Sequence, residues 1–269
     1  MDFGSQYSQL IARRVRELSV YSELYPCTVK ADEIADNSLR GIILSGGPAS
    51  VMSPQAPDID DAIFELDVPI MGICYGMQLI AKKFGGKLAR AKRREYGPAR
   101  LYIDCRNDIL KDIPDSTAVW MSHGDNIERL PPSFQILAHT ENLPIAVMAN
   151  SERKIYATQF HPEVKHTEMG MKILENFVGN ICGCSKEWDI GDYASEKIEQ
   201  IKHMLSADER VVLAYSGGVD STVVSAMLVR AIGDRLVPIF VDNGLLRLGE
   251  PEQVRKKFYS LFGFELDFV

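Results

Sequence analysis

Cys74 lies between two glycines at the end of an apolar run, in the segment Gly72-Ile73-Cys74-Tyr75-Gly76. The pattern Gly-x-Cys-x-Gly is typical of a nucleophile elbow, a tight turn from a strand into a helix that exposes the side chain between them. Glycines suit such a turn because a Cβ would collide with the neighbouring backbone. A helix N-terminus also favours the thiolate form of a cysteine. Cys74 is therefore a candidate nucleophile, and the alternative is a buried core cysteine in a parallel strand.

A second candidate group is His161-Pro162-Glu163, which follows the strand-like run at 155–160. Side chains two residues apart in an extended segment share a face, so Glu163 can orient the imidazole of His161. A histidine can take and return the proton of a cysteine nucleophile, while a carboxylate stabilises the imidazolium. Together with Cys74, these residues predict a Cys-His-Glu triad.

The other histidines lack this partner spacing and are interpreted as packing or surface residues: His123, His139, His166 and His203. Among them, His123 follows Ser122 in a predicted turn. We therefore expect Ser122 and His123 to line the same pocket as the triad.

A glycine-rich turn, Ser216-Gly217-Gly218-Val219-Asp220-Ser221, lies between a predicted strand and a predicted helix. Such a turn presents backbone N–H groups and the positive end of a helix dipole to phosphate. It lacks the Gly-Lys-Ser/Thr of a P-loop, so cleavage between the β and γ phosphates is not indicated. Asp220 is a candidate for positioning Mg²⁺, which prefers carboxylate and phosphate oxygens. The alternative is a solvated Gly-Ser loop.

Composition limits the class of protein. The 269 residues are 46% hydrophobic and 25% charged, which is ordinary for a soluble globular chain. A net charge of −7 argues against nucleic acid or an anionic membrane as a partner, and the one basic run, Arg90–Arg94, is short. Neither a membrane span nor a signal peptide is recognisable, so we expect a cytoplasmic protein.

The five cysteines are scattered and odd in number, which fits reduced thiols better than a disulfide framework. Cys182 and Cys184 lack a second ligand pair at zinc spacing and are interpreted as structural.

Alternating strand and helix patterns predict an α/β fold in two successive regions. The first is expected to hold a helix at 7–18, strands at 20–24 and 40–45, a helix at 58–66, the strand leading to Cys74 and a helix at 76–84. Short strands around Leu101, Val119, Ile136, Ile145 and Ile155 then predict an antiparallel addition, followed by a helix at 167–181. After a polar linker at 183–191, the second region should hold helices at 192–205, 221–232 and 250–262 and strands at 210–215 and 236–241.

The segment 72–78 together with His161-Pro162-Glu163 resembles the class I glutamine amidotransferases, which hydrolyse glutamine to glutamate and ammonia through a cysteine thioester. The resemblance spans residues 1–187 and implies an open mixed sheet with flanking helices. It also implies a role for each matching residue: Cys74 as nucleophile, His161 as general base and acid, Glu163 as its orienter, Gly46, Gly47 and Tyr75 as oxyanion-hole residues, and Gln78 as a glutamine-binding residue. Taken without Cys74, Gly46-Gly47-Pro48 would be interpreted as a plain turn.

Residues 216–221 resemble the pyrophosphate-binding loop of N-type ATP pyrophosphatases, which have an adenine nucleotide α-hydrolase-like parallel sheet. This resemblance covers residues 188–269. It implies an ATP site made of Ser216, Gly217, Gly218, Val219, Asp220, Ser221 and Val241.

The two regions in this order resemble the glutamine-hydrolysing GMP synthase family. In that family XMP is adenylated by MgATP, and ammonia then displaces AMP to give GMP. The implied partners are glutamine, ATP and XMP, with Mg²⁺ but no organic prosthetic group, no nucleic acid and no membrane.

The chain departs from this family at both ends. The family's first strand precedes Asp2-Phe3-Gly4, and its ATP domain continues past Val269 into an XMP-binding region through which the intact protein forms a homodimer. We therefore expect at most weak glutaminase activity and no GMP formation from this chain. Three alternatives stay open: another glutamine-dependent ATP pyrophosphatase ligase, a cysteine hydrolase that never uses ATP, and a non-catalytic fragment that only binds a partner.

Overall fold

The computed structural model describes residues 1–269 except for the side chains of 91–94, so most of the basic run Arg90–Arg94 lies outside the described residues. The chain divides into two compact units, an N-terminal unit (Met1–Trp188) and a C-terminal unit (Asp189–Val269). In the part of the chain described, no helix is long and apolar enough to cross a membrane.

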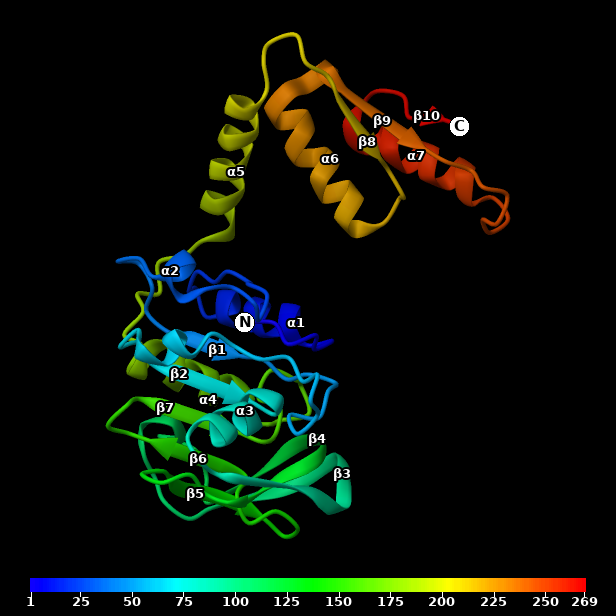
Figure 1. The fold of residues 1–269 in the computed structure, drawn as a ribbon. Coiled ribbons are helices and arrows are strands. Elements are labelled where there is room, and N and C mark those ends of the chain that lie inside the picture. Colours follow the sequence, from blue (N-terminus) through cyan, green and yellow to red (C-terminus); the bar gives the residue numbers. More distant parts are fainter. The chain divides into compact units, whose positions relative to one another are not determined.

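The N-terminal unit is built on a seven-stranded sheet with the order β1-β2-β7-β6-β5-β3-β4 (Figure 1). Its strands are β1 (Ile42–Leu44), β2 (Ile70–Ile73), β3 (Lys87–Ile103), β4 (Ser116–Arg129), β5 (Gln135–Thr140), β6 (Val147–Asn150) and β7 (Ile155–Thr158). The first two strands and β7 are parallel, while the remaining pairs are antiparallel. The predicted α/β mixed sheet with an antiparallel addition is confirmed.

Helices cover both faces of this sheet. They are α1 (Ser8–Glu17), α2 (Ala31–Ile34), α3 (Tyr75–Lys83) and α4 (Gly170–Glu175), with 3₁₀ turns at Asp61–Glu65 and Asp108–Leu110 and a π-helix at Asn176–Ile181. Alternate residues of β2 point to opposite faces. Met71 and Ile73 share a buried cluster with α1 and α4, whereas Ile70 belongs to a second cluster with α3.

Three sequence predictions need correction. Residues 20–24 form no strand, because the nearest backbone pairing is the single bridge between Asp2 and Pro26. The predicted helix at 58–66 is a short 3₁₀ helix that begins after Asp60, whose side chain accepts from the Ala62 N–H. The runs around Leu101 and Val119 are not short strands but parts of β3 and β4, which pair in register along most of their length.

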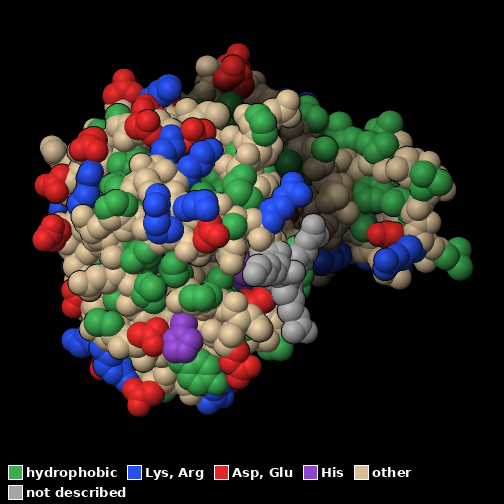
Figure 2. All heavy atoms as spheres, turned by 60° about the horizontal axis from the view of Figure 1, so that its bottom comes forward, with side chains coloured by type: hydrophobic (Ala, Val, Ile, Leu, Met, Phe, Trp, Pro, Cys, Tyr) green, Lys and Arg blue, Asp and Glu red, His purple; other side chains and the backbone are tan. Residues whose placement is uncertain are grey.

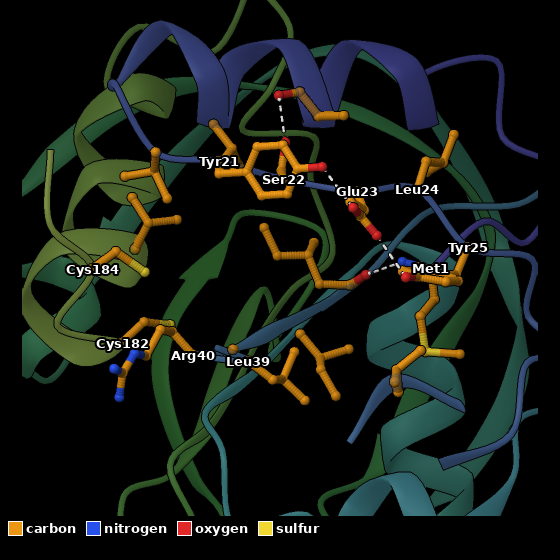
Figure 3. A pocket seen from close by; sticks show the side chains of 18 of the residues that line it. Met1, Tyr21, Ser22, Glu23, Leu24, Tyr25, Leu39, Arg40, Cys182 and Cys184 are labelled. Atoms are coloured by element: carbon orange, nitrogen blue, oxygen red, sulfur yellow. Dashed lines mark hydrogen bonds between the residues drawn. The ribbon is translucent and has the colours of Figure 1, made fainter. Parts of the chain in front are cut away.

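A cavity of about 510 Å³ lies beside β1, at the edge of the sheet (Figure 3). Residues 20–25 line one side of it and 38–43 the other. At one end of the cavity, the backbone of Met1 pairs with the β1 segment in the pattern of parallel strands. Its amino group donates to Ile43 O at 2.6 Å, and its carbonyl accepts from the Ser45 N–H at 3.1 Å. Burial lowers the pKa of that amino group to about 6.

The C-terminal unit holds a three-stranded parallel sheet with the order β10-β9-β8. Its elements are α5 (Ile190–Met204), β8 (Val211–Ala214), α6 (Val219–Ile232), a 3₁₀ turn (Gly233–Arg235), β9 (Leu236–Phe240), α7 (Glu250–Phe262) and β10 (Asp267–Phe268). Tyr215, Phe240 and Phe258 pack together in one core cluster, and Leu228, Ile232 and Leu236 in another. The predicted order of helices and strands is confirmed here.

Basic and acidic side chains are interspersed over the face of the N-terminal unit drawn in Figure 2. Among the side chains coloured by type on that face, no large patch of one charge is visible.

Candidate active site

Cys74 lies at the junction between β2 and α3. Its backbone has φ 51° and ψ −99°, a conformation that a non-glycine residue adopts only under constraint from its surroundings. A Cβ on Gly72 would lie 2.7 Å from the carbonyl group of Gly76, and a Cβ on Gly76 would lie 2.4 Å from the Leu44 carbonyl oxygen. Both glycines are therefore required for the close approach of α3 to the strands, as the elbow pattern predicts.

His161 lies between Cys74 and Glu163. Its Nδ1 is 2.7 Å from Glu163 Oε1, and the two side chains are 5% and 0% exposed. Burial by itself would lower the pKa of His161, but hydrogen bonds to Cys74 and to Glu163 outweigh it and raise the pKa to about 10. Cys74 Sγ also lies 3.4 Å from the Ser122 carbonyl oxygen. A buried carboxylate thus holds a protonated imidazole beside the thiol.

Replacing His161 with asparagine is expected to lower the stability of the N-terminal unit most at pH 6.5 and progressively less up to pH 10. The folded protein binds the His161 proton more tightly than the unfolded chain, in which the ordinary pKa is 6.5. The stabilising contribution is therefore complete below pH 6.5 and lost as the pH rises through about 10. Urea unfolding of both proteins across this range measures the difference. A difference that stays constant with pH would contradict the assignment.

The turn Gly46-Gly47 lies against the triad. A Cβ on Gly46 would be 3.1 Å from His161 Cε1 and 3.7 Å from Cys74 Cβ, and one on Gly47 would be 3.3 Å from the Tyr75 ring. The Gly76 N–H donates to the Ser45 carbonyl at 3.1 Å, which fixes this turn to α3. Tyr75 is the first residue of α3, where N–H groups have no intrahelical acceptor. Backbone donors from both segments are thus close to Cys74.

Gln78 and His123 are both buried in one polar network. Gln78 Nε2 donates to the Asp125 carbonyl at 3.0 Å and to Gln159 Oε1 at 3.3 Å. The ring nitrogens of His123 lie 3.1 Å from the same carbonyl and 3.2 Å from a carboxylate oxygen of Glu95. The side chain of His123 is therefore engaged within the protein, while the carbonyl of the preceding residue, Ser122, lies beside Cys74 Sγ.

Two residues of the site were missed by sequence reasoning. Arg14 of α1 donates from Nε to the Glu163 carbonyl at 2.9 Å. Tyr7 packs edge-on against the His161 ring, with ring centroids 5.2 Å apart. Nothing in the local sequence indicates either contact, because α1 is distant from His161 along the chain.

Comparison with known proteins identifies the family to which the chain belongs. Residues 1–181 match the family model described as glutamine amidotransferase class-I. The chain belongs to this family. It is 31% identical to a candidate GMP synthase subunit from Thermoplasma acidophilum, whose crystal structure it matches with a TM-score of 0.61 over 74% of this chain and 95% of that one.

Longer relatives of this amidotransferase extend the similarity over the C-terminal unit. This chain is 53% identical over 265 residues to a glutamine-hydrolysing GMP synthase from a Nitratiruptor species, and the match covers 97% of this chain and 51% of that protein. It is 49% identical over 269 residues to one from Bacillus cytotoxicus, covering 100% and 52%. The amidotransferase chain thus spans about half the length of these relatives.

In the C-terminal unit of this amidotransferase, the loop 216–218 connects β8 to α6. Gly217 has φ 78°, and Gly218 precedes the first residue of the helix. The helix begins at Val219, two residues earlier than predicted, so Asp220 and Ser221 lie in its first turn. Ser216 Oγ is 3.1 Å from Ser221 Oγ, which closes the loop over the helix N-terminus.

Two further predicted nucleotide-site residues are exposed. Val241 directly follows β9 and is 59% exposed, and Asp220 is also exposed. Among the described residues, no group of three or more His, Cys, Asp or Glu side chains could hold a metal ion. A cation at Asp220 would therefore need further ligands from a bound nucleotide.

Proposed function

We propose that the N-terminal unit hydrolyses glutamine at Cys74 and that the C-terminal unit is the first part of an ATP pyrophosphatase domain, as parts of a GMP synthase. The observation that carries the proposal is the buried Cys74-His161-Glu163 arrangement at a strained elbow. The identity of about 50% to GMP synthases over nearly the whole chain supports the acceptor chemistry.

The proposed reaction begins with the Cys74 thiolate, whose proton is held by His161. The thiolate attacks the carboxamide carbon of glutamine, and the backbone N–H groups of Tyr75 and Gly47 bind the oxyanion that forms. His161 then protonates the departing ammonia, which leaves a glutamyl thioester on Cys74. Water attacks the thioester while His161 accepts its proton, and glutamate is released. Glu163 stabilises the imidazolium each time it forms in the cycle.

Glutamine recognition is proposed to involve Gln78 together with the backbone of Ser122 and His123. The contacts of Gln78 to Asp125 and Gln159 are both made by its Nε2, so its Oε1 takes no part in them. The two hydrogen bonds donated by Nε2 hold this buried amide in place.

The released ammonia is proposed to displace AMP from XMP that has been adenylated by MgATP. The loop 216–218 and the N-terminus of α6 would bind the pyrophosphate of ATP through backbone N–H groups, with Asp220 near the Mg²⁺ that ATP carries. The parallel strands β8 to β10 fit an adenine nucleotide α-hydrolase-like sheet, with this loop at the carboxyl end of β8. In the intact protein, a C-terminal region would complete the XMP site and form a homodimer.

The proposal is tested by incubating the purified chain with glutamine and measuring the glutamate formed, with asparagine as the control substrate. Formation of glutamate, with little hydrolysis of asparagine, is expected. If neither glutamate formation nor labelling of Cys74 by a glutamine-mimicking electrophile is detected, the proposed function is wrong.

Replacing Gly218 with valine is expected to weaken ATP binding at least about tenfold. The added side chain would occupy space at the helix N-terminus, yet Gly218 has φ −77° and its nearest neighbour to a new Cβ is Ser216 Oγ at 3.4 Å, so the fold should tolerate it. Equilibrium binding of MgATP measures the effect. Ala207→Val, in an exposed turn before β8, serves as the control. Equal affinity of Gly218→Val and wild type would favour a hydrolase that does not use ATP.

A further inference from the structure

The backbone of His161 leaves the sheet in an unusual way. Its N–H donates to the Trp120 carbonyl of β4 at 3.1 Å, as in a strand. The next residue is Pro162, which has no N–H to donate. The carbonyl of His161 is buried and the N–H of Trp120 is partly buried, so both need another partner.

The hydroxyl of Thr167 supplies both partners. Thr167 Oγ1 donates to the His161 carbonyl at 2.6 Å and accepts from the Trp120 N–H at 3.1 Å. The residue is 4% exposed, so water does not compete for these contacts. The Thr167 hydroxyl oxygen therefore bridges the Trp120 N–H of β4 and the His161 carbonyl, two groups that would bond directly to each other in a regular pair of strands.

Thr167 is itself held in place by its neighbours. Its N–H donates to the Val164 carbonyl, and its carbonyl accepts from the Gly170 N–H, both at 3.1 Å. The Glu168 N–H donates to the Ala118 carbonyl at 3.1 Å, and the Glu168 carboxylate accepts from the Ala118 N–H at 3.2 Å. The loop after His161 is thus fastened to β4 on both sides of Thr167.

We infer that Thr167 is a positioning residue, which sets the backbone of His161 so that its imidazole lies between Cys74 and Glu163. This role rests on the proposed glutaminase function. It predicts an effect on the rate of the chemical step and little effect on glutamine binding, because Thr167 contacts His161 and β4 and none of the groups assigned to glutamine binding.

Valine has nearly the shape of threonine but no hydroxyl, so Thr167→Val removes the partner of the buried His161 carbonyl and of the partly buried Trp120 N–H. We expect its kcat for glutamine hydrolysis to fall about 10- to 100-fold, since a displacement of about 1 Å at a reacting group has effects of this size. KM should stay within about twofold of the wild-type value. Thr167→Ser keeps the hydroxyl and should restore kcat to within about threefold.

A second readout follows the pairing of Cys74 with His161 directly. The rate of alkylation of Cys74 by iodoacetamide is measured against pH in wild type, Thr167→Val and His161→Asn. In Thr167→Val, the pH dependence of the alkylation rate of Cys74 should become more like that in His161→Asn. Thr140→Val is the matched control, because Thr140 is also 4% exposed and its hydroxyl also accepts a backbone N–H, that of Leu143, away from the triad.

The inference is overturned if Thr167→Val keeps the wild-type kcat and alkylation profile. It is also overturned if Thr140→Val shows the same loss, or if Thr167→Ser fails to restore the rate. Should the wild-type chain not hydrolyse glutamine, the proposed function fails, and the alkylation profile still decides the role of Thr167.

Discussion

Replacing Cys74 with serine is expected to reduce glutamine hydrolysis by about 10⁴-fold or more, a loss of the size seen when an enzyme nucleophile is removed. Serine has nearly the same volume and can still donate to the Ser122 carbonyl, so the elbow should keep its conformation. The hydroxyl holds its proton far more strongly than a thiol, so serine at this position is a much weaker nucleophile. Glutamate release under substrate saturation measures the loss.

Cys105→Ser is the matched control for this experiment. Cys105 is an exposed free thiol whose Sγ contacts the backbone of its neighbour Arg106, and it takes no part in the site. It should retain wild-type activity. If Cys74→Ser kept more than about a tenth of that activity, another nucleophile would be responsible and the triad assignment would be wrong.

The elbow and the triad tripeptide could be predicted because their chemistry is local in sequence. Gly72, Cys74 and Gly76 must follow one another closely to form the turn, and His161 and Glu163 share a face two residues apart. The alternation of strands and helices likewise predicted the parallel pairing of β1 with β2, since a parallel connection needs a crossover. These features survive in the structure with small shifts of the helix and strand ends. The alternation did not predict the parallel pairing of β7 with β2, because the run around Ile155 was assigned to the antiparallel addition.

Contacts between distant segments could not be predicted in this way. Arg14 and Tyr7 contact Glu163 and His161 from a segment far away along the chain, whose sequence contains no sign of these contacts. The contact of His123 with Glu95 depends on the register of β3 against β4, which places these two residues opposite each other. Residues 20–24 have strand-like composition but no neighbouring ladder, and composition alone does not provide one.

Replacing Gly76 with alanine is expected to destabilise the N-terminal unit by about 3 kcal/mol, at the upper end of what overpacking costs. The added Cβ would lie 2.4 Å from the Leu44 carbonyl oxygen and 2.8 Å from Leu44 Cβ. Leu44 is fully buried in β1, so relief requires that α3 move away from the strand and carry the backbone donor of Tyr75 with it. Activity should therefore fall together with stability.

Urea unfolding followed by tryptophan fluorescence measures this effect selectively, because both tryptophans, Trp120 and Trp188, belong to the N-terminal unit. Gly179→Ala is the matched control, since its new Cβ would have Lys186 Cε at 3.8 Å as its nearest neighbour. The control should unfold at nearly the wild-type urea concentration. If Gly76→Ala and Gly179→Ala were equally stable, the close approach of α3 to β1 would not explain the glycine at position 76. Gly72 alone would then account for the conformation of the elbow.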